Sequence, residues 1–130
     1  MNTPEWINGP EELPPNSVFV FGSNTQGIHG RGSAKTAIDK FGAVYGQGYG
    51  RQGMSYAICT TDFEREGRYP LEFIDQQIDE FLLYASLHQD ELFYVTKIGT
   101  HLAGYTVDDI AALWRNKITE PNVILPKEFV

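Results

Sequence analysis

Residues 18–24 read VFVFGSN, four apolar residues that pass directly into glycine, serine and asparagine. A continuous apolar run of this length predicts a strand covered on both faces, as in a parallel sheet flanked by helices. Glycine where such a strand ends permits a positive φ and lets a ligand approach the backbone closely. We therefore expect a strand over Val18 to Phe21 that leads into a ligand-binding loop.

The segments that follow alternate between helical patterns and apolar runs. We expect helices over 33–41, 71–89 and 106–117, and further strands over 55–60, 92–98 and 122–125. Gly42 is placed to end the first helix, and Thr106 with Asp109 resembles a capping box that opens the last one. This alternation predicts an α/β domain with three layers, α/β/α, and a mostly parallel sheet.

Length and charge exclude several classes of protein. The 130 residues suit one domain over 1–130, with 1–16 as an irregular lead-in that Trp6 and Ile7 tack onto the core. A net charge of −7 argues against a broad basic face for nucleic acid. The sequence has no apolar run long enough to span a membrane, no signal peptide and a single cysteine, Cys59, which we expect in the core. Cytoplasmic location is the expectation.

Glycine is strongly clustered along the chain. All of the 13 glycines except Gly9 and Gly67 fall in three stretches, 22–32, 42–53 and 99–104. Loops that follow parallel strands meet at one edge of the sheet, so we expect these stretches to converge on a pocket of backbone N–H groups suited to phosphate. The alternative is that the glycines only form turns.

Positive charge gathers where the glycines are. Residues 22–53 carry Arg31, Lys35, Lys40 and Arg51 against Asp39 alone, a sum of +3, so the remaining residues sum to −10. A small anionic ligand is the partner that this pattern favours, although Lys40 fits a solvated helix surface.

Familiar catalytic motifs are absent or out of place. Residues 48–53 match G-x-G-x-x-G, but they follow a predicted helix and lead into a strand, the reverse of a dinucleotide fingerprint. The three histidines and one cysteine lack metal-ligand spacing, so we expect neither a metal nor another cofactor. No G-x-S-x-G nucleophile elbow occurs.

Three side chains near the glycine stretches could act in catalysis or orient a ligand. Asn24 offers a donor and an acceptor to a ribose diol. His29 could contact the ligand or transfer a proton, because imidazole titrates near neutral pH. Asp62, just after the second predicted strand, could act as a general base, contact an adenine amino group or cap a turn.

The order and spacing of these motifs resemble a divergent macro domain, the module that binds ADP-ribose. The resemblance covers about residues 17–118 and rests on Phe21 to Asn24, on Gly30 to Ile38, and on the loop IGTHLAGY at 98–105. It departs from the family where His29 and Arg31 replace glycines and where residues 47–62 have no clear counterpart.

The resemblance implies a macro-like fold and a set of ligand contacts. Asn24 would orient the distal ribose, while the two loops would hold the diphosphate. The implied ligand-binding residues are Phe21, Gly22, Ser23, Gly30, Arg31, Gly32, Ser33, Gly99, Thr100, His101, Gly104 and Tyr105. An aromatic ring, of Phe21, Tyr49 or Tyr105, would stack on adenine or ribose.

Function then divides into three alternatives. The first is an enzyme that binds ADP-ribose or a related NAD-derived nucleotide and hydrolyses an ADP-ribosyl bond, with Asn24, His29 and Asp62 as candidate catalytic residues. The second is a module that binds such a nucleotide without turnover. The third is a protein-interaction domain with structural glycines. A monomer or small homo-oligomer is expected in each case.

Overall fold

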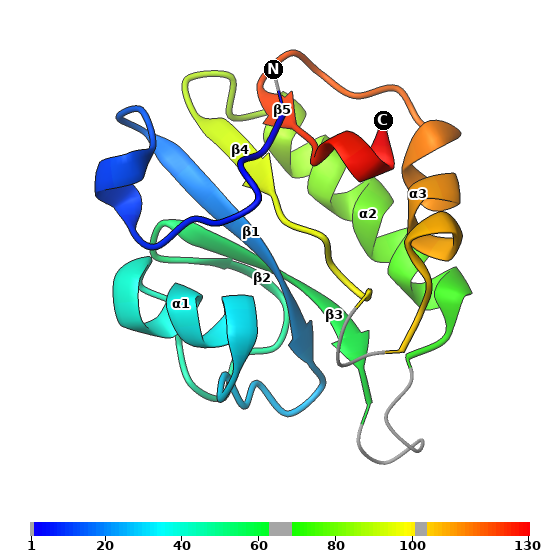
Figure 1. Ribbon diagram of the computed structural model, residues 1–130, viewed down its shortest axis with the longest axis horizontal. Coiled ribbons are helices and arrows are strands. Elements are labelled where there is room, and N and C mark those ends of the chain that lie inside the picture. Colours follow the sequence, from blue (N-terminus) through cyan, green and yellow to red (C-terminus); the bar gives the residue numbers. More distant parts are fainter. Residues whose placement is uncertain (1, 63–68, 101–103) are drawn as a thin grey trace.

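The computed structural model describes residues 2–62, 69–100 and 104–130 and has a mixed α/β fold built on one five-stranded sheet (Figure 1). The strands are β1 (Ser17–Asn24), β2 (Gly50–Gln52), β3 (Ser55–Thr61), β4 (Leu92–Val95) and β5 (Val123–Ile124). Their order is β2-β3-β1-β4-β5, and every neighbouring pair is parallel except β2 with β3. The expected α/β class and mostly parallel sheet are therefore confirmed.

Strand β1 lies at the centre of the sheet, between β3 and β4. Its successive side chains point to opposite faces: Val18 and Val20 join one buried cluster, and Phe19 and Phe21 join the other. The four residues are at most 2% exposed, which is why the sequence shows a continuous apolar run rather than an alternating one.

The α-helices within the described ranges divide between the two faces of this sheet (Figure 1). Helix α1 (Gly32–Lys40) packs Ala34 and Ala37 against Phe19 and Phe21. Helices α2 (Leu71–Ser86) and α3 (Val107–Arg115) pack on the face of Val18 and Val20. No helix in the described ranges combines the length and apolar character that crossing a membrane requires.

Several element boundaries differ from the expectations. Strand β1 continues through Gly22 to Asn24, so the first loop begins later. Helix α2 ends at Ser86, before residue 89. Strand β4 ends at Val95 instead of Ile98, because the chain turns and the Ile98 N–H donates to the Thr96 carbonyl at 2.8 Å.

The sequence contains no strand signal for β2, which lies inside the second glycine stretch and forms an antiparallel hairpin with β3. Gly50 has φ +77° and Gly53 has φ +60°, so the hairpin depends on glycine conformations and shows no alternation of apolar and polar residues. The expected capping box is confirmed: the Thr106 hydroxyl accepts from the Asp109 N–H, and the Asp109 carboxylate accepts from the Thr106 N–H.

The N-terminal lead-in is mostly irregular, with a 3₁₀ turn at Pro10–Glu12. Thr3 fixes it to the far edge of the sheet by donating its N–H to the Leu125 carbonyl and its hydroxyl to the Ile124 carbonyl. Ile7 packs against the α1-side core as expected. Trp6 does not, since it is 79% exposed, and the expectation that it anchors this segment is wrong.

Candidate functional site

A cleft of about 1020 Å³ opens where β1, β3 and β4 end. Its lining includes Asn24 at the end of β1, Thr61 at the end of β3, and Thr96 just after β4. In open α/β sheets, ligands bind outside the carboxyl ends of strands, where connections leave the sheet in opposite directions. Here the chain leaves β1 for α1 on one face and leaves β3 for α2 on the other face.

The amino end of α1 opens into this cleft. Arg31, Gly32, Ser33 and Ala34 all line it, and no side chain caps the first turn of the helix. The unpaired N–H groups of a helix start carry partial positive charge and favour an anion. The helix start and the Arg31 guanidinium thus make this part of the cleft suitable for phosphate.

Gly30, beside that helix start, is a glycine that the fold itself does not require. Its φ lies outside the left-handed region, and a Cβ built on it would meet no atom within 4 Å. Gly99, another glycine of the cleft, is required by the fold itself, because it has φ +75° and a Cβ there would lie 2.9 Å from Ile110. A glycine with open space above its backbone is expected where a ligand comes close.

Asn24 lines the cleft but already holds the first loop together. Its Nδ2 donates to the Ile28 carbonyl at 2.7 Å, and its Oδ1 accepts from the Ile28 N–H at 2.9 Å. One amide hydrogen and one lone pair are left for a ligand. Neighbouring Ser23 donates its hydroxyl to the Gly48 carbonyl, which joins this loop to the second glycine stretch.

Of the residues that the resemblance implied for ligand binding, those lining the cleft are Gly22, Ser23, Gly30, Arg31, Gly32, Ser33, Gly99 and Thr100. Phe21 does not line it, being fully buried against His29. Gly104 and Tyr105 are also absent from the lining, and the Tyr105 hydroxyl donates to the Tyr69 carbonyl at 2.6 Å. His101 lies outside the described residues.

The two candidate proton-transfer residues among the described ones also lie outside the cleft lining. His29 is 3% exposed, and its Nε2 lies 3.0 Å from the Val44 carbonyl oxygen and 3.1 Å from that of Gln47. Two acceptors on one nitrogen require that Nε2 carry the proton, so the ring acts as a tie between loops. Asp62 is 8% exposed and accepts from the Thr25 hydroxyl at 3.3 Å.

The second glycine stretch supports the first loop instead of lining the cleft. A Cβ at Gly48 would overlap the Asn24 carbonyl, and one at Gly27 would lie 2.8 Å from the Gly46 Cα and closer still to the next backbone atoms. None of residues 42–53 lines the cleft. Two of the three stretches therefore meet there, and in the remaining one Gly42, Gly48 and Gly53 allow close backbone packing.

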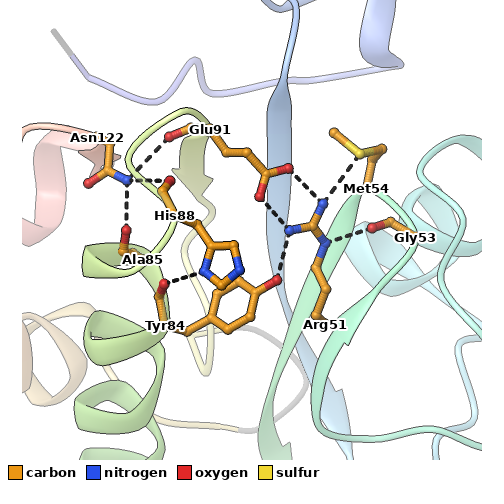
Figure 2. Close-up of polar contacts among 8 residues, drawn as sticks. All are labelled: Arg51, Gly53, Met54, Tyr84, Ala85, His88, Glu91 and Asn122. Atoms are coloured by element: carbon orange, nitrogen blue, oxygen red, sulfur yellow. Dashed lines mark hydrogen bonds and ion pairs between the residues drawn. The ribbon is translucent and has the colours of Figure 1, made fainter.

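Most of the positive charge in 22–53 is used away from the cleft. Arg51, in β2, forms a bidentate ion pair with Glu91, with N–O distances of 2.7 and 2.8 Å, and donates a hydrogen bond to the Tyr84 hydroxyl (Figure 2). Glu91 directly precedes β4, so this cluster lies at the opposite end of that strand from the cleft. Lys35 pairs with Asp39 on the exposed side of α1. Of the four cations, Arg31 is the one that lines the cleft.

The sequence reasoning missed three groups of cleft residues. Thr60, Thr61 and Thr96 line it at strand ends, a polar signal directly after buried runs that could have been recognised. Lys97 lines it as a second cation. Residues 2–8 and 126–128 also form walls of the cleft, but local sequence patterns do not predict the tertiary packing that brings them there.

Cys59 is buried in β3, and burial raises the pKa of its thiol to about 11, so it stays protonated near neutral pH. This supports its expected place in the core. Among the residues that the structure describes, no group of three or more His, Cys, Asp or Glu side chains is arranged to hold a metal ion.

No family model, curated protein or solved structure matches this chain.

Proposed function

We propose that this protein binds ADP-ribose or a related NAD-derived nucleotide in the cleft at the carboxyl ends of β1, β3 and β4. The observation that carries the proposal is the uncapped start of α1, which faces the cleft beside Arg31 and beside Gly30, a glycine without a structural reason. Backbone N–H groups, a guanidinium and a closely approachable backbone are together the recognition chemistry of a phosphate group.

The size of the cleft favours a ligand larger than a mononucleotide. Small-ligand sites usually measure about 300–1,000 Å³, and the value of about 1020 Å³ lies just above that range. The lining also runs well beyond the phosphate region, from Arg31 across Thr96 to Lys127. A diphosphate that joins two ribosyl groups would use this length.

The resemblance to macro domains supports the same ligand class and extends the proposal to the fold. The resembling segments, 21–24 and 30–38, supply much of the cleft wall, and Gly99 and Thr100 come from the third. Placing α1 on one face of the sheet, with α2 and α3 on the other, is compatible with a three-layer, macro-like arrangement.

We favour binding without turnover over hydrolysis of an ADP-ribosyl bond. Hydrolysis requires a group that moves a proton at the reacting atoms. His29 and Asp62 both lie outside the cleft lining and make contacts within the protein. The carboxylates of Glu5 and Glu128 do line the cleft, but both are paired with Lys97. Assays for product release from free, protein-linked and nucleic-acid-linked ADP-ribose distinguish the two functions.

Calorimetric titration of the purified protein tests the proposal directly. We expect ADP-ribose to bind with a micromolar dissociation constant, about −8 kcal/mol, and AMP to bind at least tenfold more weakly because it lacks the second phosphate and ribose. Equal affinity for the two ligands would contradict an extended site, and no binding of ADP-ribose at all would refute the proposed function.

Substituting Gly30 by alanine tests the phosphate region separately from stability. We expect ADP-ribose affinity to fall at least tenfold, because the new methyl group projects into space reserved for the ligand, while the thermal midpoint changes little. Gly9→Ala is a control outside the cleft lining, where the three atoms nearest to a new Cβ all belong to the flexible Glu11 side chain. If Gly30→Ala binds like the control, the open backbone is not a ligand contact.

A further inference from the structure

One wall of the cleft is formed by residues 2–8, a segment that runs past the end of β4 (Figure 1). This segment is fixed on both sides of Trp6. Thr3 is hydrogen-bonded to Leu125 and Ile124, and Ile7 packs against the α1-side core. The backbone at Trp6 is therefore held in place by contacts that do not involve its indole ring.

The indole ring of Trp6 itself lies at the cleft without being packed into the protein. Trp6 is a cleft-lining residue and is 79% exposed, whereas the other tryptophan, Trp114, is 1% exposed. Tryptophan has the largest apolar surface to bury, and leaving it in water forgoes that free energy. A fixed backbone that presents an uncovered indole at a ligand cleft is the arrangement of a stacking surface.

The cleft lining also contains carboxylates, one of them on Glu5, the neighbour of Trp6 in the sequence. Lys97 Nζ lies 3.8 Å from the Glu5 Oε1 and 3.4 Å from the Glu128 Oε2, and all three residues line the cleft. Carboxylate oxygens accept hydrogen bonds from an exocyclic amino group. The phosphate-binding features, Arg31 and the start of α1, come from a separate segment of the lining.

The geometry points to Trp6 as the residue that stacks on the base of the nucleotide and sets the preference for a ligand with an aromatic base. In this orientation the phosphates lie at the start of α1, and the base lies against Trp6, with its amino group toward the carboxylates of Glu5 or Glu128. The inference rests on the proposed function and deepens it, because it names an aromatic base bearing an amino group as the part recognised by Trp6.

The test combines substitutions at Trp6 with tryptophan fluorescence. We expect Trp6→Ala to weaken ADP-ribose binding about tenfold, which corresponds to about 1.4 kcal/mol and lies within the range for base–aromatic stacking. Trp6→Phe should retain most of the affinity, and Trp6→Leu, apolar but not aromatic, should lose it. Tyr45→Ala is the control, because Tyr45 is 67% exposed and lies outside the cleft lining.

Fluorescence reports the contact without depending on affinity. Since Trp114 is buried, a change in emission on adding ADP-ribose to the wild-type protein should come from Trp6 and should vanish in Trp6→Phe. Unchanged affinity in Trp6→Ala, equal affinities of the Phe and Leu variants, or unchanged emission on binding would each overturn the inference while leaving the proposed function intact. Failure of the wild-type protein to bind ADP-ribose by calorimetry would overturn both.

Discussion

Replacing Gly27 by alanine is expected to lower the free energy of unfolding by about 2–5 kcal/mol. The left-handed conformation, φ +69°, costs a residue with a Cβ about 1–2 kcal/mol. The new methyl group would also overlap the backbone of Gly46 and Gln47, and overpacking of this kind costs about 1–3 kcal/mol. Urea unfolding followed by circular dichroism measures the change.

Gly46→Ala is the matched control for that experiment. Gly46 also has a positive φ, +96°, but a Cβ there would meet no atom within 4 Å. Its loss of stability should therefore contain the conformational cost alone and should be clearly smaller. Equal losses in the two variants would show that the two glycine stretches are not packed backbone to backbone.

The second large effect is expected for Arg51→Met, which removes the ion pair with Glu91 and keeps the length of the apolar side chain. Breaking a fully buried pair costs about 3–5 kcal/mol. Because the side chains of Arg51 and Glu91 retain 24% and 15% exposure, we expect a smaller loss of about 2–3 kcal/mol in the free energy of unfolding at pH 7. Thermal or urea unfolding measures it.

The loss should depend on pH in a defined direction. Hydrogen bonds from Arg51 hold the pKa of Glu91 below its ordinary value of about 4.3. The stabilisation is present above the unfolded pKa and disappears as the pH falls through the lower folded pKa. The difference between wild type and Arg51→Met should therefore shrink below about pH 4.

Lys35→Met serves as the control for the Arg51 variant, because the Lys35–Asp39 pair is exposed, with side-chain exposures of 59% and 48%. Its effect should stay within about 0.5 kcal/mol. A destabilisation by Arg51→Met that is equally large at pH 3 and pH 7 would mean that packing, not charge, accounts for it.

The sequence was sufficient to predict those parts of the fold that depend on local burial or on hydrogen bonds between residues close in the chain. The run Val18 to Phe21 predicted a doubly covered strand because both faces of β1 are packed. The box of Thr106 and Asp109 predicted a helix start because its hydrogen bonds are local. Strand β2 was not predicted, since its three residues pair with β3 between two glycine turns and bear no apolar alternation.

The site was predicted in part for a similar reason. Gly30 to Ser33 line the cleft because they follow β1 in the chain and begin α1 there. Arg51 was assigned to the positive region by its position in the sequence, but its partner Glu91 is 40 residues away and cannot be foreseen from local spacing. Trp6 was assigned to the core by its chemistry alone, whereas its exposure depends on how Thr3 and Ile7 hold the chain.

The attachment of Thr3 to Leu125 brings two stretches from opposite ends of the sequence to one rim of the cleft. The shape of this rim therefore depends on a pairing between residues that are more than 120 positions apart in the sequence. A backbone change at Ile124 or Leu125 would be transmitted through Thr3 to the wall that carries Trp6, although neither residue lines the cleft itself.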